Sequence, residues 1–317
     1  MGPLLFAWLS YAIYQQLRHQ TDLAASWAQV KRTFGTRLVW NLWWVLGLML
    51  VNWGLEAWKW QLVTRPVQSV SFLTAFKAVL SGLSVSVSTP NRMGEYLGRV
   101  LYMEEGNRLR TISLTILSSM SQLIITLAMG GIGLVCLLPA IYSGELVSAF
   151  WVRVLLYTIL AGLAALTLFY FRMGWLARWV SRLGKNSKYV YLLQAVGAVN
   201  ATLLWQLLSL SLLRFVVFAT QYYLLFSLFG VSIAWWQSFW AVSILFLVLA
   251  ILPTIALVEV VQRGTVALKI FRLLTANELG VGLTTVSIWF INLILPALVG
   301  SLLILSIKIF RSKHESV

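Results

Sequence analysis

The chain contains long apolar runs, each near or above the length needed to cross a membrane. These runs span residues 112–138, 151–171, 205–230, 233–252 and 284–307. An α-helix needs about 20 residues to cross the hydrocarbon core of a bilayer. The chain of 317 residues is 60% hydrophobic and 10% charged, whereas a soluble domain carries about 25% charged residues. The sequence therefore predicts an all-α polytopic membrane protein.

Basic residues greatly outnumber acidic residues. The chain has 24 Lys and Arg against nine Asp and Glu, which gives a formal net charge of +15. In a soluble protein this balance suggests nucleic-acid binding, but in membrane proteins Lys and Arg collect on cytoplasmic loops. Basic clusters lie within 18–37, 172–188 and 308–313. We therefore expect a multi-pass protein of the bacterial inner membrane with no nucleic-acid partner, and we expect residues 174–200 to lie along the membrane surface.

Two similar stretches interrupt the apolar pattern. The first is STPNRMGEYLGR at 88–99, and the second is PTIALVEVVQRG at 253–264. Each places a proline five or six residues before a glutamate, and an arginine four residues after that glutamate. Proline suits the first turn of a helix, and a glutamate four residues before an arginine lies on the same helix face. The residues concerned are Pro90, Glu95 and Arg99 in the first stretch and Pro253, Glu259 and Arg263 in the second.

This repetition predicts two related halves, about 38–171 and 189–308, within a single integral membrane domain covering 1–317. Each half contains one helix that breaks inside the membrane, as in transporters built from internal repeats. Non-helical backbone at that depth is tolerated only where protein or a wet cavity covers it. We therefore expect about six to eight transmembrane helices with two broken or re-entrant segments. The expected breaks are at Pro90, Gly94 and Pro253.

The broken segments predict a site for an anionic lipid headgroup. The N-terminus of a half-helix attracts anions through its free N–H groups. Arg92, Arg99 and Arg263 lie close in sequence to the two expected breaks, and we expect them to bind a phosphate group. Arg214 lies inside the apolar run 205–230, where it either snorkels to the membrane surface or joins the same site.

The two glutamates of these stretches allow more than one role. Glu95 and Glu259 are placed to hold Arg99 and Arg263 by ion pairs. They are also candidates for proton coupling, because ionisable groups inside membrane segments are costly and usually functional. A purely structural clamp explains the same spacing, so the sequence leaves these alternatives open.

The first stretch resembles a motif of a known family. Pro90, Arg92, Gly94 and Glu95 match the P-x-R-x-G-E motif of the lysylphosphatidylglycerol synthase transmembrane-domain family, the flippase-like membrane half of the multiple peptide resistance factor. The second stretch matches a later motif of that family in part, because isoleucine and alanine stand where glycines are usual. The resemblance covers most of the chain. It implies movement of an anionic or modified phospholipid, or of another lipid-linked headgroup, between leaflets.

Three functions compete for this sequence. A lipid translocator is expected not to use ATP directly, because no G-x-x-x-x-G-K-[ST] loop is present. An intramembrane enzyme is not expected, since His19 and His314 lie near the chain ends and Asp22 is the only aspartate. We expect no cofactor, no metal and, with the sequence ending shortly after the last apolar run, no synthase domain.

The alternative to a translocator is a non-transporting accessory subunit of a lipid-modifying or glycosyltransferase system. Its candidate partners besides membrane lipids are an enzyme or a second copy of the chain.

Overall fold

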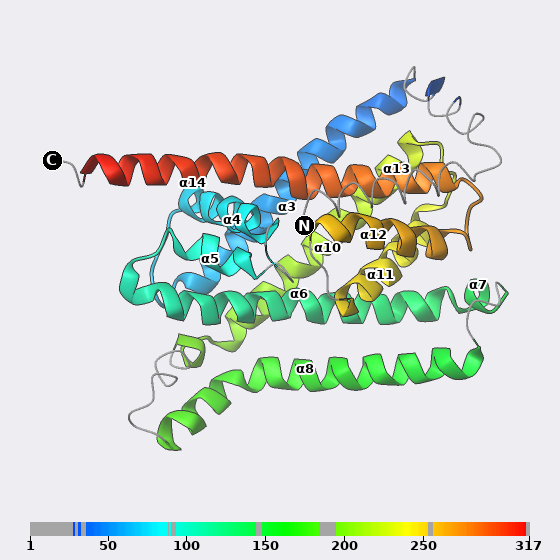
Figure 1. The fold of residues 1–317 in the computed structure, drawn as a ribbon. Helices are drawn as coiled ribbons and strands as arrows, with labels where there is room; N and C mark the ends of the chain where they lie inside the picture. Colours follow the sequence, from blue (N-terminus) through cyan, green and yellow to red (C-terminus); the bar gives the residue numbers. More distant parts are fainter. Residues whose placement is uncertain are drawn as a thin grey trace. The chain divides into compact units, whose positions relative to one another are not determined.

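The computed structural model describes residues 28, 31–32, 36–87, 89, 93–143, 148–183, 195–252 and 256–314. In this part of the chain there are eleven α-helices and no strand (Figure 1). Five helical stretches are long and apolar enough to cross a membrane, and the shorter apolar helices Phe72–Val87 and Trp235–Ile251 accompany them. The long stretches are Arg37–Thr64, Glu105–Cys136, Ala149–Trp175, Ala201–Leu228 and Glu278–Ser306. The prediction of an all-α polytopic membrane protein is confirmed.

The chain forms two compact units, each assembled from three stretches of sequence. Unit 1 comprises residues 1–50, 126–161 and 215–292, and unit 2 comprises residues 51–125, 162–214 and 293–317. Several boundaries between them fall inside single helices. The pseudo-repeat of 38–171 and 189–308 stays a prediction.

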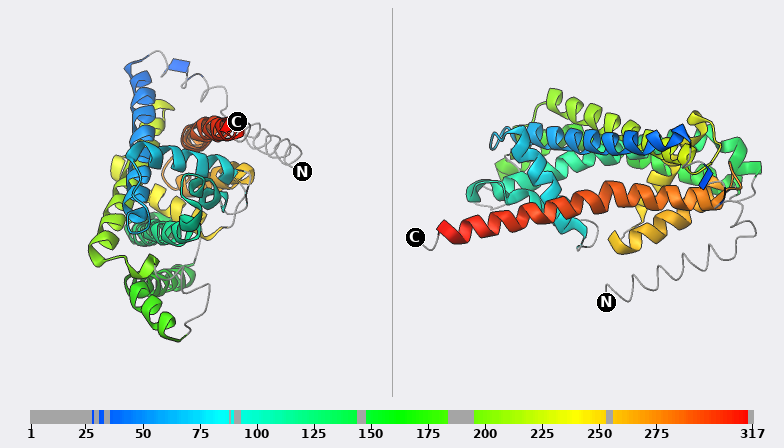
Figure 2. Two further views of the ribbon diagram at one scale, coloured as in Figure 1. Left: turned by 90° about the vertical axis from the view of Figure 1, so that its left-hand side faces the viewer. Right: turned by 90° about the horizontal axis from the view of Figure 1, so that it is seen from above.

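Unit 2 is built around a short helical hairpin. Its helices α4 (Phe72–Val87) and α5 (Gly94–Val100) pack on each other, and α14 (Leu295–His314) packs on α4. Both views of Figure 2 show the red α14 passing beside this cyan hairpin. Parts of four longer helices complete the unit: α3 (Trp40–Thr64), α6 (Arg108–Cys136), α8 (Ala149–Leu183) and α10 (Ala201–Leu228).

Glycines allow the backbones of α4 and α5 to pack directly against each other. A Cβ atom on Gly98 would lie 2.5 Å from the Gly82 Cα, and one on Gly94 would lie 2.7 Å from the Val85 carbonyl carbon. Real Cβ atoms do not come this close to backbone, so a larger residue would push the helices apart. A Cβ on Gly300 would likewise meet the Leu80 backbone. Small residues are the usual means by which membrane helices come together.

Unit 1 contains a second pair of helices joined by a short connection. In it α12 (Ala256–Phe271) contacts both α11 (Trp235–Ile251) and α13 (Glu278–Trp289). Unit 1 also contains α7 (Leu138–Ser143), and the π-helical turn Phe290–Ile294 crosses the boundary between the two units. Gly133 of α6 faces α11 closely, since an added Cβ would lie 2.9 Å from the Trp240 carbonyl oxygen.

Two expected helices have different bounds in the structure. Residues 174–183 continue α8, whereas residues 184–194 of the expected surface stretch 174–200 lie outside the described residues, so its position along the membrane stays a prediction. The expected last span at 284–307 starts earlier, at Glu278, where the Asn277 side chain accepts a hydrogen bond from the Gly280 amide at 2.9 Å. That bond satisfies one of the free N–H groups of the first turn and fixes the start of α13.

Candidate functional site

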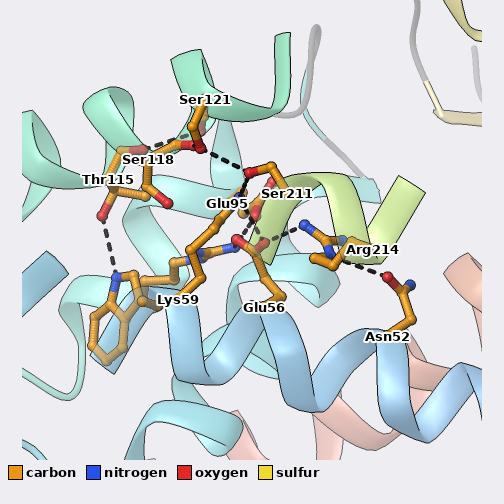
Figure 3. Close-up of polar contacts among 12 residues, drawn as sticks. Asn52, Glu56, Lys59, Glu95, Thr115, Ser118, Ser121, Ser211 and Arg214 are labelled. Carbon is orange, nitrogen blue, oxygen red and sulfur yellow. Dashed lines mark hydrogen bonds and ion pairs between the residues drawn. The ribbon is translucent and has the colours of Figure 1, made fainter. Parts of the chain in front are cut away.

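One carboxylate of α3 is surrounded by three cations in unit 2 (Figure 3). Arg99 donates from Nη2 to Glu56 Oε1 at 2.8 Å, and Lys59 Nζ lies 3.2 Å from Glu56 Oε2. Arg214 donates from Nη1 to the same Oε2 atom. All four side chains are buried. A buried charge is tolerated only where opposite charges and hydrogen bonds replace its water, and here each cation depends on Glu56.

Helical spacing on α3 places the polar side chains together. Asn52, Glu56 and Lys59 are separated by four and three residues, so they lie on one face of the helix. Asn52 Oδ1 accepts a hydrogen bond from Arg214 Nε at 3.0 Å. The Arg214 guanidinium carbon also lies 5.8 Å from the centre of the Trp53 ring. Arg214 is thus held on α10 by a carboxylate, an amide and an aromatic face, and it does not snorkel.

The Arg99 side chain extends from α5 across α4 to Glu56, because the two helices of the hairpin pack closely at Gly82. A Cβ on Gly82 would lie 2.9 Å from the Arg99 Cγ, so the arginine side chain passes directly over this glycine. Arg99 also forms an ion pair with Glu95, one turn earlier in α5. The pairing that the sequence spacing predicts is therefore confirmed. The Glu95 side chain is 27% exposed, whereas that of Arg99 is 1% exposed.

The Arg99 guanidinium keeps donors that no described protein group accepts. Its Nη2 atom serves both Glu56 and Glu95, while Nε and Nη1 are buried without a hydrogen-bond partner. An unsatisfied buried donor costs about 1–3 kcal/mol, and more on a charged group. The arrangement therefore leaves two charge-assisted donors, Nε–H and Nη1–H, which point to different sides of the guanidinium and can each donate to an anion oxygen.

Hydroxyl groups surround the Lys59 ammonium group. Lys59 Nζ donates to Ser211 Oγ at 3.3 Å, and Ser211 Oγ lies 2.8 Å from Ser121 Oγ. Ser121 in turn donates to the Ser118 carbonyl oxygen at 2.6 Å. These buried serines on α6 and α10 supply hydrogen bonds that water would otherwise give.

The cluster carries an excess of positive charge. Three cations, Arg99, Arg214 and Lys59, face two carboxylates, Glu56 and Glu95, so the formal sum is +3 − 2 = +1. A buried site with unbalanced charge favours a ligand of the opposite sign. No group of side chains suited to a metal ion occurs among the described residues.

The structure brings together three of the residues that the sequence singled out: Arg99, Arg214 and Glu95. Gly94 begins α5, and its amide donates to Thr89 Oγ1 at 2.7 Å. Arg263 lies half-buried in α12 of unit 1. Four other expectations fall outside the described residues: Pro90, Arg92, Pro253 and the side chain of Glu259.

Sequence reasoning missed the centre of the site. Glu56 and Lys59 lie in the apolar, tryptophan-rich stretch 38–63, and neither was among the predicted site residues. The available signal was the presence of two charged residues three positions apart in an otherwise apolar helix. Such residues seldom lie at membrane depth without partners, and Arg214 lies in an equally apolar run.

The helices and the buried ion cluster define a multi-pass membrane protein with a polar site inside one compact unit. The chain matches the family model described as "Lysylphosphatidylglycerol synthase TM region" over residues 2–300. It belongs to this family of membrane domains linked to lipid modification. Comparison with curated proteins found no match.

Proposed function

We propose that the protein moves a lipid with an anionic or modified phosphate-bearing headgroup between the leaflets of the bacterial inner membrane. Membership of a lipid-linked membrane family supports a lipid ligand. The basic clusters of the sequence support a bacterial plasma membrane with cytoplasmic Lys and Arg. In this proposal the chain performs no covalent chemistry, in keeping with a sequence whose two histidines, His19 and His314, lie near its ends.

The observation that carries the proposal is the pair of open donors on Arg99. Nε and Nη1 are buried and unpartnered, and the surrounding charges sum to +1. A phosphate group has the sign that this charge favours and several oxygens that can accept from Nε or Nη1. The phosphate group is shared by glycerophospholipids and lipid-linked sugars, so the site recognises the headgroup chemistry rather than one lipid.

Glu95 gives the proposed site a means of release. It pairs with Arg99 from a partly exposed position, whereas Glu56 holds the same guanidinium from a buried one. We propose that Glu95 stays paired with Nη2 of Arg99 when a headgroup binds at Nε or Nη1, and that its negative charge keeps the headgroup from being held too tightly. A ligand held too tightly would not leave, so a neighbouring internal carboxylate favours turnover.

The two helical pairs α4–α5 and α11–α12 are proposed to be re-entrant segments that expose their connections to the lipid path. Each pair is joined by a short connection, and its first helix has fewer residues than a span normally needs. In this proposal Arg92 makes a further headgroup contact in the first pair, and Arg263 and Glu259 act in the second pair as Arg99 and Glu95 do in the first.

The test is leaflet exchange in liposomes that contain the purified protein. Fluorescent phosphatidylglycerol and fluorescent phosphatidylcholine are compared by dithionite quenching. We expect exchange of the anionic lipid to fall at least about tenfold in Arg99→Lys, because a lost charge-assisted hydrogen bond is worth about 1.5–3 kcal/mol. Lysine keeps the charge that Glu56 needs, so the fold is preserved.

The matched control is Arg272→Lys. Arg272 also pairs with a glutamate, Glu278, but its side chain is 59% exposed, and we expect wild-type exchange. Equal exchange in Arg99→Lys and wild type would contradict the proposed role of Arg99. If neither lipid exchanges faster than in empty liposomes, with and without a proton gradient, the accessory-subunit function replaces the translocator.

A further inference from the structure

We propose that Lys59 is a proton-binding site whose occupancy is coupled to anion binding at Arg99. The proposal concerns a residue that the headgroup contact itself does not use. It rests on the proposed function, because the coupled anion is the phosphate-bearing headgroup.

Lys59 is the group in the cluster that can lose a proton most readily. Arginine stays protonated at any pH a protein tolerates, whereas a buried lysine can become neutral. Lys59 shares Glu56 Oε2 with Arg214, and the other oxygen of Glu56 accepts from Arg99. Three cations therefore depend on one buried carboxylate, and Lys59 is the surplus cation. Without its proton, two arginines face two carboxylates and the formal charge is balanced.

The charged and titratable groups around Lys59 come from several elements. Glu56 lies on α3 itself, Arg99 with Glu95 on α5, Arg214 on α10, and Tyr170 on α8 beyond the serines. The two arginines oppose the charge of Lys59, and Glu56 supports it. Each added negative charge nearby therefore favours the protonated lysine.

Ser211, which contacts Ser121, can form a hydrogen bond with Lys59 in both its protonated and its neutral form. Ser211 Oγ accepts from the ammonium at 3.3 Å, and either Ser211 or Ser121 can be the donor in their 2.8 Å contact. A hydroxyl both donates and accepts, so Ser211 can turn its hydrogen toward a neutral amine. A lysine surrounded by apolar side chains would lack this alternative.

A chain of hydroxyls connects Lys59 with an open cavity in the same unit. The Tyr170 hydroxyl interacts electrostatically with Ser121, and it donates its own hydrogen to the Leu204 carbonyl oxygen at 3.1 Å. Tyr170 lines a cavity of about 390 Å³, together with Asn200 and the exposed Arg172. In this proposal protons pass along Tyr170, Ser121, Ser211 and Lys59 when the Tyr170 hydroxyl turns from the Leu204 carbonyl oxygen to Ser121.

The coupling follows from the charge sum. An anion on Arg99 raises the negative charges to three, Glu56, Glu95 and the ligand, and these balance Arg99, Arg214 and a protonated Lys59. Anion binding therefore favours proton uptake by Lys59. By linkage, protonation of Lys59 strengthens anion binding by the same factor.

The experiment counts the protons taken up when a probe anion binds. The purified full-length protein in neutral detergent is titrated with dihexanoylphosphatidylglycerol by calorimetry, in buffers of different ionisation enthalpy, from about pH 6 to about pH 10. We expect uptake to rise toward about one proton per bound probe as Lys59 deprotonates, and the affinity to fall by up to about tenfold per pH unit there. At the acid end no proton is taken up, because Lys59 is already charged.

Two variants of the same residue keep the test decisive. Lys59→Arg keeps a cation without a releasable proton, so binding should persist with no proton uptake and a flat pH profile. Lys59→Met removes the cation with a similar length, so binding should be weaker, equally flat and without uptake. Lys77→Arg is the matched control, since Lys77 is an exposed lysine of α4, and it should keep wild-type uptake.

The possible failures are distinguishable. Probe binding by the wild type without proton uptake at any pH would overturn the coupling and leave the proposed function standing. Uptake that persists in both Lys59 variants would assign the proton to another group and also overturn it. If the probe does not bind at all, anion binding by Arg99 fails, and the coupling fails with it.

Discussion

Glu56 holds the cluster together because its two oxygens are shared by Arg99, Arg214 and Lys59. We predict that Glu56→Gln lowers the free energy of unfolding by about 3–5 kcal/mol, the range seen when one partner of a buried ion pair is removed. The amide keeps the shape of the side chain but leaves three buried cations with Glu95 as their nearest acid. Thermal unfolding in detergent, followed by tryptophan fluorescence, measures the loss.

Glu105→Gln is the matched control for this prediction. Glu105 also contacts an arginine three residues away, but its side chain is 77% exposed. Exposed ion pairs are worth about 0–1 kcal/mol, so the midpoint should hardly move. An unfolding temperature for Glu56→Gln as high as that of the control would show that the cluster does not stabilise the fold.

At the residue scale the sequence predicted the Glu95–Arg99 pair of the site but not its central carboxylate, Glu56. The i,i+4 spacing of Glu95 and Arg99 anticipates their ion pair, whereas for Arg214 the sequence left open whether it snorkels or joins the site. Glu56 was not predicted, since its two arginine partners lie 43 and 158 residues away in the sequence. A contact between distant helices depends on tertiary packing, which local spacing does not encode.

The α4–α5 hairpin positions Arg99 so that it donates a hydrogen bond to Glu56 on α3. We predict that Gly98→Ala lowers the free energy of unfolding by about 1–3 kcal/mol, the usual range for an overpacked contact. Its new Cβ would lie 2.5 Å from the Gly82 Cα and 2.6 Å from the Ser81 carbonyl oxygen, and backbone cannot move aside as a side chain can. The same thermal unfolding assay measures the effect.

Gly162→Ala in α8 separates this packing effect from helix propensity. No atom lies within 4 Å of a Cβ at Gly162, so alanine there should leave stability unchanged or raise it by up to about 1 kcal/mol. If Gly98→Ala is as stable as Gly162→Ala, the close approach of α4 and α5 is not required for the fold.

At the element scale, apolar runs predicted the existence of the long helices better than their ends. The run 112–138 corresponds to α6, which starts at Arg108, and 205–230 corresponds to α10, which starts at Ala201. Helix ends depend on caps and on packing, and polar residues extend a helix beyond the membrane without an apolar signal. This is why the basic residues after 171 were separated from α8, although the helix continues to Leu183.

At the scale of the whole molecule, membrane topology follows from which helices cross. The apolar part of α8, Ala149–Trp175, is long enough to span the bilayer. A crossing helix places its two ends on opposite sides, and the basic residues that follow its apolar part favour the cytoplasm. Ser148 and Thr202, which flank α8 and the segment after it, should therefore lie on opposite sides of the membrane.

Cysteine labelling tests this topology directly. The chain has one cysteine, Cys136, so a Cys136→Ser background accepts single reporters at Ser148 and Thr202, both of which are exposed. We predict that Ser148→Cys reacts with a membrane-impermeant maleimide on intact cells, while Thr202→Cys reacts only after the membrane is opened. Labelling of both reporters from outside would mean that α8 does not cross, and that the basic stretch 172–188 is not held in the cytoplasm. The reverse pattern would keep the crossing but invert the molecule, and the excess of Lys and Arg would then not set its orientation.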